Sequence, residues 1–412
     1  RLAARIFGRQ LGDLEQRCVD GDLDPRHGPG ATADRVLGNP KFDFAEWPSR
    51  LDREFPAADY IIPGYGWWRS LSGVEFLPPE RERPVRVITV PKTASKARII
   101  AMEPVAMQYA QQALFKSFSR VFSDGCKLID LTDQSRNRRF ARLGSADGSL
   151  ATLDLSEASD RVTLETVEAV FSRFPNLLRA LLASRSTRAQ LPDGTVIDGL
   201  AKFASMGSAT CFPVESIVFT VAAVLGIQRA VNATSSPPLS FQEALERVSV
   251  FGDDIIVPTC YVQDVIKVLV SIGARPNPDK SFWTGMFRES CGGDYFAGED
   301  VGVFRVRQRL PRSRQDAKEL LSLVSLRNQA YMAGYWQTAR RIDEWLAELR
   351  VPMPIVEPTS SVAGRWSVAF SHEVHRFDRD LQAPLVRGLV TKSPRVFNPA
   401  SELGALLKCT LT

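Results

Sequence analysis

Residues 248–258 read VSVFGDDIIVP, and this stretch is the strongest single indication of the fold. Two short apolar runs flank Gly252, Asp253 and Asp254, which is the pattern of a β-hairpin with a tight turn. Because both arms are apolar, we expect the hairpin to lie in a core with its acidic tip at a cleft. The alternative is an ordinary solvated turn, in which the two aspartates have no chemical role.

A second acidic position supports the first interpretation. Asp154 lies at the end of a buried-type strand predicted for residues 150–155. Two carboxylates as close as Asp253 and Asp254 repel each other unless a proton or a cation lies between them. If the two elements share a sheet, the three aspartates converge. Such oxygen ligands suit Mg²⁺ and can hold two ions about 3.5–4 Å apart, as in phosphoryl and nucleotidyl transfer.

A basic segment is expected to accompany such a metal site. Residues 86–98 (RVITVPKTASKAR) carry Arg86, Lys92, Lys96 and Arg98 at even positions. In an extended strand these four side chains share one face, and a row of cations suits a triphosphate. The alternative is a solvated edge strand that is protected by its basic side chains.

A short loop, Ser205–Gly207, precedes a long apolar helix predicted for residues 209–231. A Ser/Gly loop at a helix start offers backbone N–H groups to a phosphate or a ribose, although a serine there can simply cap the helix.

Further strands are predicted at 85–90 and within 282–306, and further helices at 103–122, 157–174, 261–273 and 315–350. This interleaving of helices and strands indicates an α/β or α+β protein.

Composition narrows the class of protein. The chain has 412 residues, 44% of them hydrophobic and 24% charged, as in a globular protein of two or three subdomains. Arg supplies 41 of the 52 basic residues, which favours a polyanionic partner. The longest apolar run, 217–227, is shorter than the ~20 residues of a membrane span. The six Cys show no C-x-x-C spacing, so we expect reduced thiols rather than a zinc site or a disulfide framework.

Taken in order along the chain, these segments resemble a known set of polymerase motifs. The segments similar to motifs A, B, C and D of viral RNA-dependent RNA polymerases are Asp154–Asp160 (DLSEASD), Ser205–Gly207 (SMG), Phe251–Asp254 (FGDD) and Asn277–Phe282 (NPDKSF). Three more segments match a narrower pattern, the replicase catalytic subunit of single-stranded RNA bacteriophages (leviviruses): Arg26–Thr32, Val90–Pro104 and Arg288–Gly292. The resemblance extends from about residue 26 to 305.

The resemblance implies an α+β, right-hand polymerase fold with fingers, a palm and a mostly helical thumb. The palm would be an antiparallel sheet that carries the GDD hairpin. The expected parts are fingers at 1–148, palm with motif A at 149–165, a fingers insertion at 166–203, palm with motifs B to E at 204–304, and thumb and C-terminal region at 305–412.

The resemblance also assigns a catalytic role to four residues. Asp154, Asp253 and Asp254 would be the catalytic ligands of two Mg²⁺ ions, for which Mn²⁺ can substitute. Lys280 would be a general acid that gives a proton to the leaving pyrophosphate.

The same resemblance assigns the nucleotide site. Lys92, Lys96 and Arg98 would bind the triphosphate, and Asp160, Ser205 and Gly207 would position the nucleotide and read its ribose. One residue departs from the pattern, because Ser208 stands where many such polymerases have an Asn that contacts motif A. Sugar discrimination is therefore the least supported of these roles.

The function implied is template-directed synthesis of RNA from ribonucleoside triphosphates, to replicate a viral RNA genome. The implied partners are template and product RNA, host translation elongation factors Tu and Ts, and a ribosomal protein, in the cytoplasm of a bacterial host and without a membrane. A reverse transcriptase is the first alternative, which Gly252 and the polar Asp160 disfavour. The second is a catalytically inactive palm-fold protein that binds RNA or assembles complexes, which would be expected to lose at least one of the three aspartates.

Overall fold

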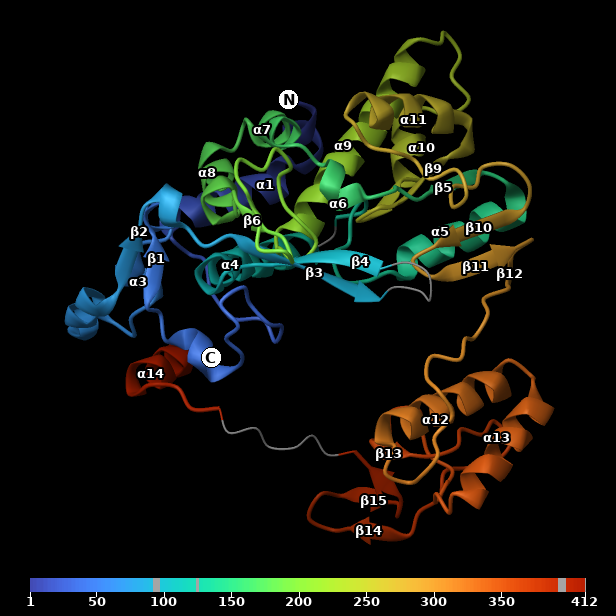
Figure 1. Cartoon of the computed structure of the whole chain (residues 1–412). Coiled ribbons are helices and arrows are strands. Elements are labelled where there is room, and N and C mark those ends of the chain that lie inside the picture. The colour runs from blue at the N-terminus through green and yellow to red at the C-terminus, as the bar shows by residue number, and fades with distance from the viewer. Residues whose placement is uncertain (92–96, 124–125, 392–397, 412) are drawn as a thin grey trace. The chain divides into compact units, whose positions relative to one another are not determined.

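The computed structural model describes residues 1–91, 97–123, 126–391 and 398–411. The chain forms two compact units, of which the first contains Arg1–Val301 and Asn398–Thr412 and the second contains Gly302–Phe397 (Figure 1). The C-terminal residues 398–412 therefore group with the first unit, whereas the sequence interpretation joined them to 305–397. The division of the first unit into fingers and palm stays a prediction.

The first unit is mixed helix and strand, which confirms the α+β class. Its helices are α1 (Leu2–Asp20), α2 (Ser49–Asp52), α3 (Ala57–Tyr60), α4 (Val105–Ser123), α5 (Ser135–Asp147), α6 (Ala158–Arg161), α7 (Leu164–Phe171), α8 (Pro175–Ser184), α9 (Cys211–Asn232), α10 (Phe241–Glu246), α11 (Val262–Ser271) and α14 (Glu402–Thr410). Its strands are β1 (Glu46–Pro48), β2 (Glu75–Leu77), β3 (Val85–Pro91), β4 (Ala97–Met102), β5 (Leu150–Leu153), β6 (Ala189–Gln190), β7 (Val196–Ile197), β8 (Ser249–Phe251), β9 (Asp254–Pro258), β10 (Phe287–Ser290), β11 (Gly293–Phe296) and β12 (Glu299–Asp300).

The predicted hairpin exists and belongs to the central sheet. Strands β8 and β9 pair antiparallel, and β9 also pairs antiparallel with β5, so the sheet order is β5-β9-β8. All four residues of β5 and the last four of β9 are buried, which explains why these positions are mostly apolar in sequence. The strand predicted at 150–155 is thus confirmed, and its end lies beside the hairpin.

Helix α9 passes through the centre of the core. It lies beside α11 and carries buried residues on every side, from Cys211 to Ile227 (Figure 1). Its length and composition would also allow a membrane span, but 83% of its most apolar window is buried inside the protein. A helix that is apolar all round is typical of the core of a large domain.

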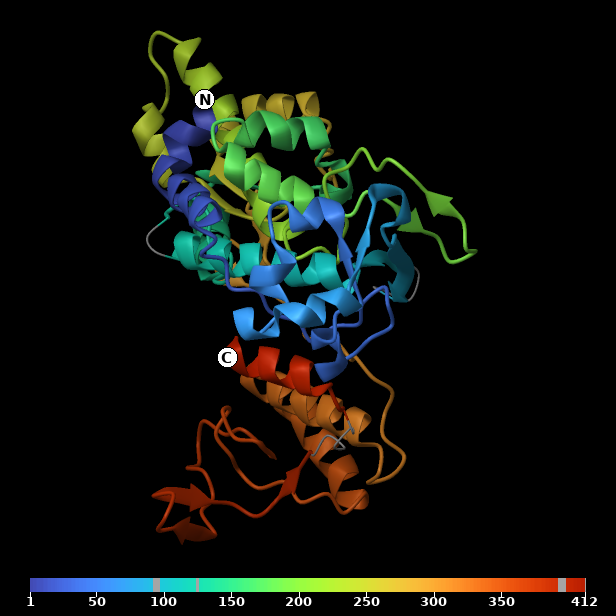
Figure 2. The same ribbon diagram turned by 90° about the vertical axis from the view of Figure 1, so that its left-hand side faces the viewer.

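The basic segment is a hairpin and does not form the single extended strand that the even spacing predicted. Strands β3 and β4 pair antiparallel, with Arg86 opposite Met102 and Val90 opposite Arg98. Directly opposite residues point to the same face, so Arg86 and Arg98 do share a face, across the pair rather than along one strand. Lys92 and Lys96 lie outside the described residues. The sheet continues in the order β4-β3-β6-β7, and the β6–β7 hairpin projects from the unit (Figure 2).

The helix predicted for 157–174 is wrong in one respect, because it is broken into α6 and α7. Between them, Val162 is extended, and Thr163 caps α7 by accepting a hydrogen bond from the Thr166 N–H. The break has a tertiary cause. The backbone at 162–164 bonds to residues 201–203, with the Phe203 N–H donating to the Val162 carbonyl at 2.8 Å. This pairing draws residues 201–203 to the end of α6.

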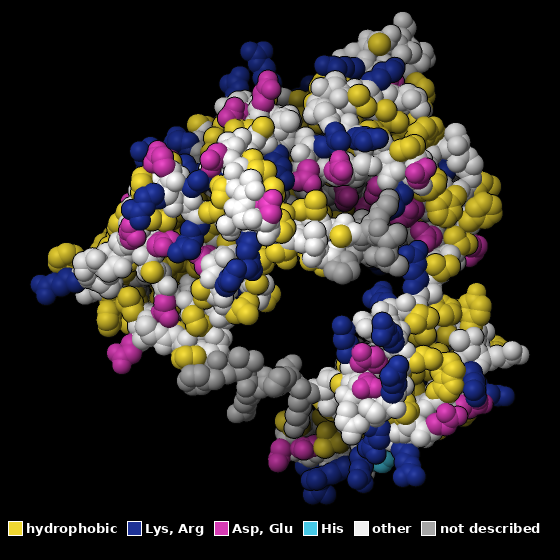
Figure 3. Space-filling model, in the orientation of Figure 1, with side chains coloured by type: hydrophobic (Ala, Val, Ile, Leu, Met, Phe, Trp, Pro, Cys, Tyr) yellow, Lys and Arg dark blue, Asp and Glu magenta, His cyan; other side chains and the backbone are white. Residues whose placement is uncertain are grey.

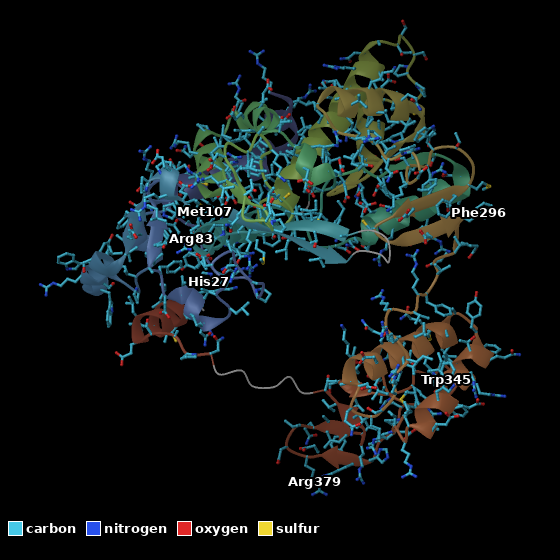
Figure 4. The ribbon with its side chains drawn as sticks, viewed as in Figure 1. His27, Arg83, Met107, Phe296, Trp345 and Arg379 are labelled. Carbon is cyan, nitrogen blue, oxygen red and sulfur yellow. The ribbon has the colours of Figure 1, made fainter. Side chains whose placement is uncertain are left out.

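The second unit consists of a helix pair and short strand pairs. Its elements are α12 (Ala317–Met332), α13 (Trp336–Glu348), β13 (Val362–Ala363), β14 (Arg376–Asp378), β15 (Ala383–Leu385) and β16 (Leu389–Val390). A small core that includes Leu323 and Leu346 joins the two helices, and Trp345 packs against it (Figure 4). The Arg327 guanidinium also donates two hydrogen bonds of 3.0 Å to the Asp343 carboxylate.

A buried acid makes stability of the first unit depend on pH. Glu103 is 2% exposed, and burial raises the pKa of its carboxyl to about 7, although hydrogen bonds from Ser186 and Gln111 partly offset that rise. Because the folded chain binds the Glu103 proton more tightly than the unfolded chain does, protonation of Glu103 stabilises the fold. This contribution is complete below the pKa that Glu103 has in the unfolded chain, and it is lost as the pH rises through about 7. We therefore expect the free energy of unfolding to fall between pH 5 and 8. In Glu103→Gln this fall should shrink by up to about 3 kcal/mol, as measured by urea unfolding across that range. An unchanged slope would contradict the assignment.

Candidate active site

The sheet register brings the three predicted aspartates to one edge. Leu153 pairs with Ile255, so the next position of the same register sets Asp154 opposite Asp254. Opposite residues of antiparallel strands have Cα atoms about 4.5–5.5 Å apart. Asp253 occupies the two-residue turn before Asp254. The three aspartates therefore lie at one edge of the sheet, as the sequence analysis predicted.

The segment 277–281 surrounds Asp154. The Asn277 side chain donates to a carboxylate oxygen of Asp154 at 3.1 Å, and the Asn277 backbone N–H donates to the Asp154 carbonyl at 2.8 Å. The Ser281 hydroxyl accepts from the Asp154 N–H at 3.2 Å. Asn277 was quoted in a motif but not predicted as a site residue. Asn277 opens an Asx-type turn, in which its side-chain oxygen accepts from the Asp279 N–H at 3.1 Å. This local pattern gave no sign that Asn277 would also reach Asp154, 123 residues earlier.

A polar network buried beneath the hairpin supports Asp254. The Ser290 hydroxyl donates to an Asp254 carboxylate oxygen at 3.2 Å, and the Asn137 amide donates to the Asp254 carbonyl, also at 3.2 Å. The Ser249 hydroxyl donates in turn to the Asn137 side-chain oxygen at 2.6 Å. Helix α5 and strand β10 thus hold the first residue of β9 in place. The sequence reasoning missed Asn137, because a lone Asn in a polar helix carries no signal.

Electrostatic repulsion marks this edge of the sheet. Burial, together with the negative charges of Asp253 and Asp154, raises the pKa of Asp254 to about 6. Acidic side chains gather on the visible face of the first unit around β5, β9 and β10 (Figure 3). Within the described residues, no group of three or more His, Cys, Asp or Glu side chains already stands close enough to enclose a metal ion. Oxygen donors that repel one another are relieved by a hard divalent cation, so the donor set fits Mg²⁺.

Lys280 stands at the same edge. Its ammonium nitrogen lies 3.8 Å from Asp154 Oδ1 and 3.9 Å from Glu289 Oε1. Lys280 is also about half-exposed, so a phosphate could reach it from solvent. The structure therefore brings the predicted proton donor to Asp154, and adds Glu289 as a second carboxylate beside it.

The Ser205–Gly207 loop lies against β4. The Ala101 N–H donates to the Met206 carbonyl at 2.8 Å, and a Cβ at Gly207 would overlap the Ala101 carbonyl oxygen. Gly207 also has a φ of 130°, a conformation that other residues rarely adopt. Arg98 is exposed at the other end of β4. The loop and the basic hairpin are therefore neighbours, and glycine is required where the two backbones meet.

Asp160 has a partner that the sequence reasoning missed. The Lys202 ammonium lies 2.5 Å from Asp160 Oδ1. Lys202 reaches Asp160 because its backbone pairs with Thr163 at the break between α6 and α7. The Arg185 guanidinium holds the same segment by donating to the carbonyls of Lys202 and Phe203, both at 2.9 Å.

Glu215 is a further acid that the sequence reasoning missed. It is 8% exposed on α9, and burial together with the charge of Asp253 raises the pKa of its carboxyl to about 8. A lone Glu in an apolar helix would ordinarily be predicted on the solvent side. Its place beside the GDD turn could not be read from the periodicity of a helix that is buried on every side.

A separate pocket of about 230 Å³ occurs in the N-terminal part of the first unit. Arg83, Met107 and Phe44 are among its lining residues, and His27 lies nearby (Figure 4). Arg83 is paired there with Glu46 and Asp34. Among the predicted site residues that the structure describes, none lines this pocket.

Comparison with known proteins identifies the family. The family model described as RNA replicase, beta-chain, matches residues 27–342. RNA-directed RNA polymerase subunits beta of Escherichia virus Qbeta and Enterobacteria phage SP are 32% and 37% identical over 342 residues, which are 81% and 82% of this chain. These matches cover 53% and 54% of the two relatives, so the chain spans about half the length of the curated relatives it matches.

A solved structure of the BmCPV RNA-dependent RNA polymerase at elongation state is also similar, with a TM-score of 0.48 and 9% identity over 79% of this chain and 31% of that one. The family match covers all four motif segments, including the three aspartates at the sheet edge. The chain therefore belongs to the RNA replicase beta-chain family.

Proposed function

We propose that this chain is an RNA-directed RNA polymerase, which joins ribonucleoside triphosphates on an RNA template to replicate a viral genome. One observation carries the proposal: in a member of the RNA replicase beta-chain family, the register of β5 and β9 brings Asp154 opposite Asp254, with Asp253 on the adjoining turn. All three carboxylates that a nucleotidyl transferase needs are present. An inactive relative would be expected to lose at least one of them.

In the proposed reaction the 3′-hydroxyl of the growing RNA attacks the α-phosphate of the incoming nucleotide. A new P–O bond forms, the bond to the β-phosphate breaks, the hydroxyl proton is released, and pyrophosphate leaves. Asp154, Asp253 and Asp254 would hold two Mg²⁺ or Mn²⁺ ions, which would acidify the attacking hydroxyl and stabilise the charge of the leaving group. Lys280, 3.8 Å from Asp154, would give a proton to the pyrophosphate.

The nucleotide would enter along the basic hairpin. Arg98 is exposed on β4, and Lys92 and Lys96 are proposed as its partners in binding the triphosphate. The loop Ser205–Gly207, pressed against β4, would position the base and sugar beside the aspartates. These roles agree with the contact between the loop and the hairpin.

Asp160 is proposed to read the ribose, and Lys202 to orient its carboxylate. A site that pairs a hydroxyl rejects the nucleotide that lacks it, because a polar group then stays unsatisfied. We expect Asp160→Ala to lower the ratio of kcat/KM for ATP to that for dATP by roughly tenfold, the effect of one orphaned group. The control is Glu157→Ala, which removes an exposed carboxylate from the start of the same short helix. If the ratio is unchanged, Asp160 does not read the ribose and only places a negative charge in the short helix α6.

The second unit supplies a surface suited to RNA. Residues 302–397 contain 16 Lys and Arg against nine Asp and Glu, whereas the rest of the chain has 36 against 38. Its first segment carries five exposed arginines: Arg305, Arg307, Arg309, Arg312 and Arg314. Phosphate contacts dominate the affinity of proteins for nucleic acid. The proposed partners are therefore template and product RNA.

Host components complete the proposal. Host translation elongation factors Tu and Ts and a ribosomal protein are proposed as partners, and the cytoplasm of a bacterial host as the place of action. Both are proposed from the resemblance to leviviruses, which the motifs at 26–32, 90–104 and 288–292 support.

The proposal is tested with the purified chain, a short RNA template, four labelled rNTPs and Mg²⁺, with and without host extract. Template-length RNA that depends on template and metal is the expected product. DNA made from dNTPs in preference would favour the reverse transcriptase alternative. RNA binding without any product, even with extract, would favour the inactive palm-fold alternative.

A further inference from the structure

One face of α9 contacts the catalytic hairpin. Phe212, Glu215 and Ser216 are three and four residues apart, so they project from the same side of the helix. The ring of Phe212 meets the ring of Phe251 edge-on, with centroids 4.8 Å apart. All three helix residues contact the two residues that precede Asp253.

Gly252 is enclosed by this face. It begins the two-residue turn between β8 and β9 with a φ of 62°, which is the position where such hairpins place glycine. A Cβ there would lie 2.6 Å from the Phe212 ring and 3.3 Å from a carboxylate oxygen of Glu215. The turn therefore fits against the helix only with glycine, and it has no room to shift toward α9.

The Ser216 hydroxyl makes a polar contact between α9 and the turn, next to the apolar contact of Phe212 with Phe251. It accepts a hydrogen bond from the Gly252 N–H at 3.0 Å and donates one to the Phe212 carbonyl at 2.8 Å. Ser216 is fully buried, so water cannot replace the hydroxyl without a change of structure. Its second bond also fixes the direction in which its lone pair faces the turn.

We propose that Ser216 is a positioning residue of the metal site: its hydroxyl anchors the Gly252 amide to α9 and so sets where the adjacent Asp253 carboxylate stands. Asp253 is exposed at the tip of the turn and follows Gly252 directly, so the place of the Gly252 backbone bears on the place of its carboxylate. The inference rests on the proposed function insofar as these aspartates bind the metal ions of RNA synthesis. Residues that orient metal ligands typically change metal affinity 10- to 100-fold when they are replaced.

The test compares Ser216→Ala with Thr220→Val in the full chain. Thr220 lies one turn along the same helix, is equally buried, and donates a hydrogen bond to the Ser216 carbonyl at 2.7 Å. Mn²⁺ binding is measured by calorimetry without RNA or nucleotide, and amide exchange is followed in the peptide 249–258. We expect Ser216→Ala to bind Mn²⁺ roughly tenfold more weakly and to exchange faster in this peptide. Thr220→Val should stay within about twofold of the unmodified chain in affinity, since it leaves the turn untouched.

Each result decides the inference. Equal Mn²⁺ affinity in Ser216→Ala and the unmodified chain would overturn it, as would an equal loss in Thr220→Val or a lack of Mn²⁺ binding by the unmodified chain. The metal measurement does not require RNA synthesis. If the unmodified chain binds Mn²⁺, Ser216→Ala weakens that binding and neither makes RNA, the proposed function fails while the positioning role of Ser216 stands.

Discussion

Asp253→Asn is expected to abolish RNA synthesis while the protein stays folded. The side chain lies at the exposed tip of the turn, so an amide of the same size disturbs no packing. An amide keeps one oxygen but loses the negative charge, and metal-assisted stabilisation of the transition state is worth several kcal/mol. We therefore expect the rate of nucleotide addition to fall by about 10³-fold or more.

The same substitution should ease the repulsion at the sheet edge. The charge of Asp253 raises the pKa of Asp254 and of Glu215, so its removal lowers both. The thermal midpoint should therefore stay the same or rise slightly. Single-turnover extension of a labelled primer–template, together with thermal unfolding, measures both effects.

The matched control is Asp264→Asn, which neutralises a carboxylate on α11 that is paired with Lys267. It should leave the rate of nucleotide addition within about twofold, because surface ion pairs contribute little. If Asp253→Asn keeps more than a tenth of the activity, the assignment of this turn as the catalytic centre is wrong.

Of the substitutions proposed, Arg288→Met is expected to lower the free energy of unfolding most. The Arg288 side chain on β10 is fully buried, and its guanidinium donates to the carbonyls of Leu150 at 2.6 Å, Phe287 at 2.7 Å and Gly285 at 3.0 Å. It thereby ties β10 to the start of β5. Methionine fills much of the volume but leaves these carbonyls without donors.

We expect the free energy of unfolding to fall by about 3–5 kcal/mol, because each buried carbonyl left without its donor costs roughly 1–3 kcal/mol. Urea unfolding measures the change. Arg173→Met, at an exposed position after α7, should stay within about 0.5 kcal/mol. A loss below about 1 kcal/mol in Arg288→Met would show that water or a side-chain rearrangement replaces the missing donors.

Much of this architecture could be predicted from local patterns. The hairpin, the strand before Asp154, α4, α9 and α11 occur close to the expected residues. Hydrophobic periodicity and turn residues act over a few positions, so they can be read directly. The failures occurred where pairing with another segment of the chain overrode the local pattern. Residues 201–203 broke the helix expected at 157–174, and β4 turned back onto β3.

The sequence by itself determined which residues are the candidates for the chemistry. Apolar strands ending in aspartates, a glycine that permits a tight turn, and a loop before a buried helix are local features, and each specifies its own element. Only the tertiary structure decided what supports them. Asn277 at Asp154, Lys202 at Asp160 and Ser216 at Gly252 join segments that lie 36 to 123 residues apart. Such contacts depend on sheet register and on the packing of α9, which emerge only when the whole core assembles, and no local periodicity encodes them.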